Sequence, residues 1–115
     1  GERLSRLGPH VALQPTAPGC DPSWHLAVSL IDFAALDRTR TRVMTDLKSR
    51  GIGTQVHYVP VPRQPYYAER YGVADLPGTD AYYARCLSLP LFAAMTEDDV
   101  DRVVDTLAAV LGVQC

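Results

Sequence analysis

The sequence lacks the features that would place the protein in a membrane or on a nucleic acid. No apolar run approaches the about 20 residues that a bilayer-spanning helix needs, and the first residues lack the apolar core of a signal peptide. The formal net charge is only -2 over 115 residues, whereas surfaces that follow a phosphate backbone are strongly basic. These absences predict a cytoplasmic protein that binds neither a membrane nor a nucleic acid.

Cysteine and histidine are too few and too scattered to form a familiar site. The three cysteines are Cys20, Cys86 and Cys115, an odd number at spacings that fit neither a disulfide framework nor a zinc site. Reduced thiols in the cytoplasm are the simplest interpretation. The three histidines show no metal-ligand spacing, and glycine-rich nucleotide loops and the G-x-S-x-G elbow are absent. We therefore expect no metal site and no catalytic residue from these motifs.

The composition fits one small globular domain. Apolar residues make up 47% of the chain and charged residues 21%, both ordinary values for such a domain. Residues 1–23 are rich in proline and glycine, which break regular structure. We therefore expect an extended or looped connector over 1–23 and a folded domain over 24–115. A chain that begins without methionine, as this one does, also fits a piece of a longer protein.

Hydrophobic periodicity predicts a strand, a helix and a second strand in the first half of this domain. Apolar side chains alternate over residues 24–31, which is typical of a strand. A helix is predicted over 39–50, and Gly51 is expected to end it because glycine accepts the left-handed conformation found after helices. Residues 54–59 are predicted to form the second strand.

The second half is predicted to be mainly helical. The helices are placed over residues 64–71, 79–87 and 96–111. Thr96 is expected to cap the last helix, whose acidic first turn suits the helix dipole. Because two strands alone do not form a stable sheet, a third is expected near 87–89 or within 9–14. The predicted fold class is therefore α+β, with a short sheet flanked by helices.

One segment combines polar and aromatic side chains in a proline-stiffened loop. It runs from the end of the second predicted strand and carries His57, Tyr58, Arg63 and Gln64. Imidazole, phenol, guanidinium and amide groups suit a sugar or a phosphate, and loops on a rigid scaffold often bind ligands. The alternative is that His57 is structural and that the tyrosines which follow the loop, Tyr66, Tyr67 and Tyr71, pack in the core or at an interface.

At this segment the sequence resembles the C-terminal portion of the DegT/DnrJ/EryC1/StrS sugar aminotransferases. The resemblance is carried, in the same order, by GIGTQVHYVP at 51–60, QPYY at 64–67, AYYARCLSLPLF at 81–92 and MTEDDV at 95–100. It extends from about Trp24 to Leu111. Within the family, the sequence is most similar to enzymes that aminate 4-keto nucleotide sugars.

The resemblance implies a particular whole enzyme. Members have the fold-type I, aspartate-aminotransferase-like fold, in which a large domain holds pyridoxal phosphate on a lysine. Glutamate is the usual amino donor and a nucleotide sugar is the acceptor. The enzymes are normally homodimers, and the small C-terminal domain helps to cover the sugar-nucleotide site. By this resemblance, the chain would be that small domain without its large domain.

Matched position by position, the resemblance gives His57, Tyr58, Arg63 and Gln64 as substrate-binding candidates. Relatives carry a histidine where this sequence has Pro62, so a family role for that histidine does not transfer. Lys48 is the only lysine, and it lies at a predicted helix end rather than in a Schiff-base motif. We therefore expect no catalytic and no cofactor-binding residue in this chain, and no transamination by the chain alone.

Two other interpretations remain open at the level of sequence. The chain could be a stand-alone interaction or regulatory module that kept this fold and lost catalysis. It could also belong to a related pyridoxal-phosphate enzyme that performs different sugar chemistry, such as dehydration. An upstream reading frame that carries a lysine-bearing domain would favour the small domain of an aminotransferase over the stand-alone module. An activity assay on the intact protein would separate amination from dehydration.

Overall fold

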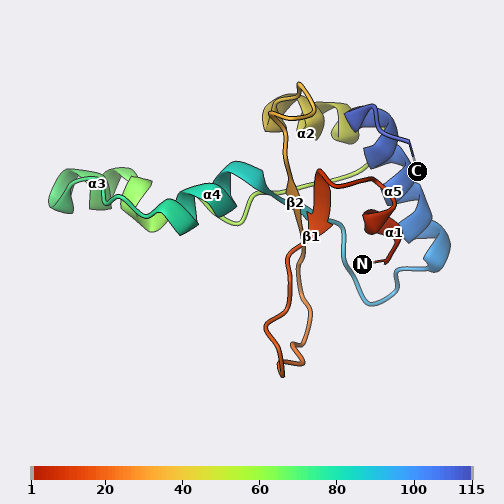
Figure 1. Cartoon of the computed structure of the whole chain (residues 1–115), viewed down its shortest axis with the longest axis horizontal. Coiled ribbons are helices and arrows are strands. Elements are labelled where there is room, and N and C mark those ends of the chain that lie inside the picture. The colour runs from red at the N-terminus through yellow and green to blue at the C-terminus, as the bar shows by residue number, and fades with distance from the viewer. Residues whose placement is uncertain (1, 115) are drawn as a thin grey trace.

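Three antiparallel strands and a set of helices form the structure, a computed structural model that describes residues 2–114 (Figure 1). In chain order the elements are α1 (Glu2–Ser5), β1 (Val11–Leu13), β2 (Ala27–Ile31), α2 (Arg40–Ser49), the 3-10 turn η1 (Val61–Arg63), α3 (Pro65–Tyr71), α4 (Pro77–Arg85), β3 (Cys86–Leu89) and α5 (Glu97–Leu111). The sheet order is β1-β2-β3. The predicted α+β class with a short sheet is confirmed. None of the helices within residues 2–114 has the length and apolar character that crossing a bilayer requires.

The sheet is built from segments that lie far apart in the sequence. β2 is central, with Val11 opposite Ile31 on one side and Leu89 opposite Ala27 on the other. Both regions named as candidates for a third strand, 9–14 and 87–89, therefore contain one. β3 joins the sheet after four intervening helices and turns, and its second edge faces Gln55 through an isolated antiparallel bridge to Ser88.

The strand predicted over residues 54–59 is wrong. Only Gln55 pairs with the sheet, and the chain leaves it two residues later. Pro60 and Pro62 follow, and proline has no N–H for a strand ladder. β3 also lies between β2 and Gln55, so the strand–helix–strand order does not place consecutive segments side by side.

The core lies between one face of the sheet and helices α2 and α5. Its fully buried apolar side chains include Ile31, Val43, Leu47, Leu87 and Leu107. α5 presents an apolar stripe to the core, since its buried residues Val103, Leu107 and Leu111 are spaced four apart. Burial of such side chains contributes about 1.5–3 kcal/mol each, and this makes the sheet and its two covering helices one unit.

The first predicted strand is confirmed but begins later than the alternation suggested. Trp24 and Leu26 precede β2, and Trp24 is 57% exposed. Within β2, Val28 and Ile31 are both buried although they point to opposite faces. The sheet is therefore covered on both faces at its centre, which simple period-two alternation does not predict.

The predicted signals at Gly51 and Thr96 are confirmed, and the structure adds a cap at Thr39. The Thr39 side chain accepts from the Arg42 N–H at 3.3 Å at the start of α2, and Gly51 follows its end with a φ of +79°. Thr96 and Asp99 form a reciprocal capping box at the start of α5. The helix predicted over 79–87 instead ends at Arg85, because Cys86 and the next residues pair with β2.

The N-terminal region is more ordered than an extended connector. α1 and β1 lie within residues 1–23, and Leu4, Leu7 and Val11 belong to the core. The stretch from 14 to 26 projects from the body as an irregular excursion between β1 and β2 (Figure 1). Residues 1–23 therefore contain a short helix and a strand beside the expected loop, because three apolar residues near the N-terminus find partners in the core.

Candidate functional site

The loop singled out in the sequence lies where the chain leaves the sheet for a projecting helical arm. We call residues 61–85 the arm; it contains η1, α3 and α4 and extends away from the body to the left in Figure 1. The candidate loop, residues 57–64, follows the bridge of Gln55 to β3 and includes the first turn of the arm, η1. A loop fixed at both ends by regular structure is a suitable carrier for ligand-contacting groups.

His57 is held by the sheet. Its Nδ1 lies 2.8 Å from the Oγ of Ser88 on β3, and the ring is partly buried. The ring of Tyr58 meets it edge-on, with centres 4.8 Å apart and planes at 85°, across a cis peptide bond. Tyr58 itself is 72% exposed, so its phenol is accessible beside the imidazole.

Arg63 and Gln64 are engaged within the arm and the loop. The Arg63 Nη2 lies 2.6 Å from the Oδ1 of Asp80, which ties η1 to α4. The Gln64 Nε2 donates to the Val59 carbonyl at 3.2 Å and closes the loop on itself. Within residues 2–114, no hydrogen bond or ion pair joins either of them to the His57–Tyr58 pair. The structure thus divides the four predicted site residues into two pairs.

Two residues that sequence reasoning missed complete the base of the arm. The Arg63 guanidinium carbon lies 6.0 Å from the ring centre of Tyr83, and that of Arg40, from the start of α2, lies 4.5 Å from the same ring. Tyr83 stands inside the family-like block 81–92, which was a usable signal. Arg40 gave none, because it is 43 residues away in the chain.

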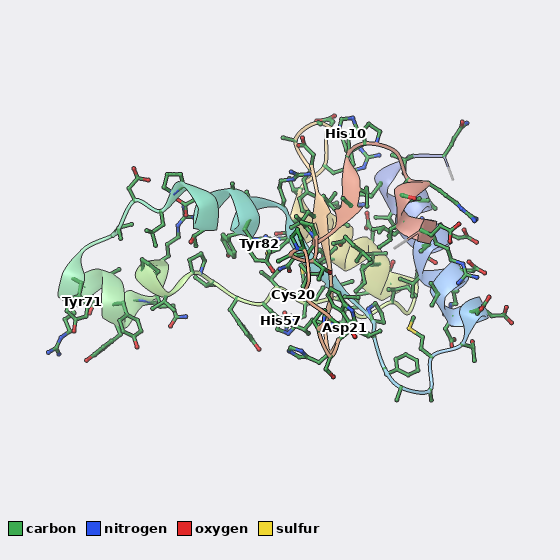
Figure 2. All side chains as sticks on the ribbon, turned by 60° about the horizontal axis from the view of Figure 1, so that its bottom comes forward. His10, Cys20, Asp21, His57, Tyr71 and Tyr82 are labelled. Carbon is green, nitrogen blue, oxygen red and sulfur yellow. The ribbon has the colours of Figure 1, made fainter. Side chains whose placement is uncertain are left out.

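The tyrosines of α3 are not part of the core. Tyr66 is 62% exposed and Tyr71 is 72% exposed, and Tyr71 lies at the far end of the arm from His57 (Figure 2). The alternative that these rings pack in the core of this chain is therefore wrong, and the alternative that they pack at an interface stays a prediction. The alternative that His57 is held structurally has support, because its Nδ1 contacts Ser88.

No metal centre is formed by the described residues. Within residues 2–114 there is no group of three or more histidine, cysteine or acidic side chains that could hold an ion. His10 lies near the top of the view in Figure 2 and His57 lies well below it. These side chains therefore do not converge.

An apolar cavity of about 350 Å³ lies apart from the loop. Its walls come from the N-terminal segment, the start of β2 and the face of α5, and include Trp24, Leu26 and Met95. No residue between 57 and 64 lines it. Its position and apolar lining separate it from the polar candidate site.

Comparison with known proteins identifies the family. The family model of the DegT/DnrJ/EryC1/StrS aminotransferases matches residues 3–108. The chain belongs to this family. The match begins earlier than the resemblance noted in the sequence, and includes α1 and β1, in agreement with their place in the fold.

Individual relatives share the fold of this chain, and each is much longer than it. The chain is 43% identical over 88 residues to the spore coat polysaccharide biosynthesis protein SpsC of Bacillus subtilis, covering 74% of this chain and 23% of SpsC. It is similar to protein Spr1654 of Streptococcus pneumoniae in its PMP form, with a TM-score of 0.82, 23% identity, and coverage of 96% of this chain and 29% of Spr1654. DesV of S. venezuelae, solved with a ketimine intermediate, gives a TM-score of 0.73 at 31% identity, covering 99% of this chain and 30% of DesV. The chain therefore spans less than a third of each relative.

The surroundings of Lys48 do not fit the role of a Schiff-base lysine for pyridoxal phosphate. A Schiff-base lysine needs a shielded pocket that lowers its pKa. Lys48, the only lysine in the sequence, is exposed in the last turn of α2. Lys48 does not line the apolar cavity beside Trp24. It also does not line a second, more polar pocket, which includes Arg38 and Asp46.

Proposed function

We propose that this chain is the C-terminal small domain of a pyridoxal-phosphate-dependent nucleotide-sugar aminotransferase, where it helps to cover the sugar-nucleotide site. The observation that carries the proposal is the family match over residues 3–108, combined with a span of only 23% of SpsC and 29% of Spr1654. The cofactor lysine would belong to the part of the whole enzyme that this chain does not contain. Residues 24–115, with the ordered segment before them, would form one side of the site.

The candidate loop is the part of the chain proposed to meet the substrate. His57 offers one ring nitrogen beyond its contact with Ser88, and Tyr58 offers an exposed phenol beside it. Both groups hydrogen-bond to hydroxyl and phosphate oxygens. Arg63 and Gln64 are proposed to act on the same ligand only by exchanging their present partners, Asp80 and Val59. Their first effect is on the shape of the loop.

The remaining components follow from the family and belong to the whole enzyme. We propose glutamate as the amino donor, a keto sugar on a nucleotide as the acceptor, a homodimer as the working form and the cytoplasm as its location. Pyridoxal phosphate would supply the electron sink for amino-group transfer. The isolated 115-residue chain is expected to be inactive in transamination, since its only lysine is exposed on α2.

The first test is cofactor capture by the longest reading frame that contains this chain. Purified protein is mixed with pyridoxal phosphate, and its absorption is recorded before and after borohydride reduction. A protein-bound band that reduction fixes onto a lysine outside residues 1–115 supports the proposal. A longer protein that captures no cofactor, or the absence of an upstream frame, would instead leave a stand-alone interaction module.

The second test asks whether the loop meets the sugar nucleotide. In the whole enzyme, Tyr58→Ala should raise the KM for the nucleotide sugar and leave the glutamate half-reaction unchanged. Tyr71→Ala is the matched control, because that ring is 72% exposed, as is Tyr58, but lies at the end of the arm. Equal effects of the two changes would remove Tyr58 from the site. A dehydrated sugar as the product would redirect the proposal to the related chemistry.

A further inference from the structure

Ser88 connects the sheet to the candidate site. It lies on β3, is only 5% exposed, and is opposite Val28 of β2. On its other side its N–H donates to the Gln55 carbonyl at 2.8 Å, and its carbonyl accepts from the Gln55 N–H at 3.2 Å. Both backbone polar groups of Ser88 are therefore bonded to Gln55, and the register of β3 with β2 places Val28 on the other side.

The Ser88 hydroxyl is directed at one nitrogen of His57. Its Oγ lies 2.8 Å from Nδ1, between residues 31 apart in the sequence. Within residues 2–114 this hydroxyl has no second hydrogen-bond partner, and a buried hydroxyl proton needs an acceptor. A hydroxyl that donates to Nδ1 of the neutral imidazole places the ring proton on Nε2.

We propose that Ser88 is a positioning residue for His57. By occupying Nδ1 it fixes the ring orientation and the tautomer, and it leaves the Nε2–H as a hydrogen-bond donor. A donor at this point fits an oxygen of the ligand, either a sugar hydroxyl or a phosphate. The part of the inference that concerns the ligand rests on the proposed function; the part that concerns the His57 ring does not.

Ser29 provides a matched comparison on the neighbouring strand. It is fully buried, and its hydroxyl donates to the Leu87 carbonyl at 2.8 Å. Among the hydrogen bonds of residues 2–114, none joins the Ser29 hydroxyl to His57. Ser29→Ala and Ser88→Ala therefore each remove one buried hydroxyl and one hydrogen bond of the same length, but only the second releases the ring.

The direct test is ¹⁵N NMR of the histidine rings in the 115-residue chain at a pH where the imidazole is neutral. The wild type should show His57 protonated at Nε2, with Nδ1 shifted by an accepted hydrogen bond. Ser88→Ala should move Nδ1 to the shift of an unbonded nitrogen, Ser88→Thr should retain the bonded shift, and Ser29→Ala should change neither ring nitrogen. A wild-type proton on Nδ1, which needs no variant to detect, would overturn the inference.

The kinetic test uses the whole enzyme. Ser88→Ala should raise the KM for the nucleotide sugar roughly three- to tenfold, the effect of one neutral hydrogen bond, with little change in kcat. Ser88→Thr should recover most of this loss, and Ser29→Ala should leave KM unchanged. On a His57→Ala background, Ser88→Ala should add nothing further. An equal KM increase on both backgrounds would show that Ser88 acts independently of His57.

The two proposals fail in different ways. If the wild-type enzyme does not transaminate but the His57 ring shows the expected tautomer and responds to Ser88→Ala, the proposed function fails and the positioning of the ring stands. If the enzyme transaminates and Ser88→Ala changes neither the ring signals nor KM, the positioning role fails and the proposed function stands.

Discussion

The guanidinium carbon of Arg40 lies 4.5 Å from the ring centre of Tyr83, and this pair joins α2 to α4. The same guanidinium donates to the carbonyls of Tyr83 and Cys86, the latter at 3.3 Å, where α4 ends and β3 begins. Carbonyls at a helix C-terminus lack partners within the helix and favour a cation. Arg40 thus fastens the base of the arm to the body of the protein (Figure 1).

Removing this guanidinium should loosen the whole domain. We expect Arg40→Ala to lower the free energy of unfolding by about 1–3 kcal/mol, because carbonyl hydrogen bonds to a charged donor and a cation–π contact are lost together. Arg40→Lys should recover only part, since a lysine lacks the planar set of donors. Urea unfolding measures both. Arg42→Ala is the control, because Arg42 lies on the same helix but is exposed, and its ion pair is with half-buried Asp46; an equal loss there would contradict the role of Arg40.

The ion pair between Arg63 and Asp80 should matter more for the loop than for stability. Its side chains are 44% and 35% exposed, so water and salt screen it, and we expect a coupling energy below about 1 kcal/mol. A double-mutant cycle of Arg63→Ala and Asp80→Ala at low and high salt measures this coupling. In the same variants, amide hydrogen exchange of residues 59–64 should accelerate. Unchanged exchange in the loop would mean that the pair does not hold it.

The capping box at the start of α5 should make the stability of the fold depend on pH in the acid range. The Thr96 N–H and then its hydroxyl donate to the Asp99 carboxylate at 2.9 and 2.8 Å, and they hold the pKa of Asp99 below its ordinary value of 3.8. A lowered pKa in the folded state contributes stability above the unfolded pKa, and this contribution is lost as the pH falls through the folded pKa. The melting temperature of the wild type should therefore exceed that of Asp99→Ala at pH 6, and the difference should shrink below pH 3.8.

Asp98 provides the control for this pH dependence. Asp98→Ala removes an equal charge from the same helical turn, but it removes neither of the two bonds that Thr96 donates. Its difference from the wild type should be smaller at pH 6. Thr96→Ala should cost about 1 kcal/mol at neutral pH through the loss of the cap. A pH profile of Asp98→Ala that matches that of Asp99→Ala would assign the effect to the helix dipole alone.

The two described cysteines should differ in reactivity. Burial raises the pKa of the Cys86 thiol above its ordinary value of 9.0, and the positive charge of Arg40 offsets part of that rise. Cys20 is exposed in the excursion between β1 and β2. At pH 8, iodoacetamide should alkylate Cys20 at least about tenfold faster than Cys86, because the thiolate is the reactive form and must be accessible.

This labelling experiment is read by peptide mass spectrometry in a Cys115→Ser background, which leaves two thiols. Urea at a denaturing concentration should bring the two rates together, since unfolding exposes both groups. Rapid alkylation of Cys86 in the absence of urea would mean that β3 opens readily. That outcome would also weaken the positioning role that we propose for Ser88.

Several elements of this fold were predictable because their signals are local. α5 has its cap at Thr96, an acidic first turn and an apolar stripe within one stretch of sequence. α2 has a cap at Thr39 and a glycine stop at Gly51. Such features depend on residues three or four apart, and no distant partner is needed to form them.

The site was predictable only in part. The loop from His57 to Gln64 was recognised by its mixture of side chains and by family-like blocks on either side of it. The division of its four candidate residues into two separate pairs was not predictable, because the partners of His57 and Arg63 are Ser88 and Asp80. Those residues lie beyond an intervening helix, where periodicity gives no information about contact.

The sequence by itself determined the α+β class, the ends of α2 and α5 and the family of the chain. Only the tertiary structure decided that β3 lies between β2 and Gln55, that α1 and β1 belong to the core, and that Ser88 meets His57. The physical reason is the range of the interactions. Caps and helix periodicity are set within one or two turns of chain, whereas strand order and side-chain pairing are chosen among many distant partners by how well the whole core can be buried.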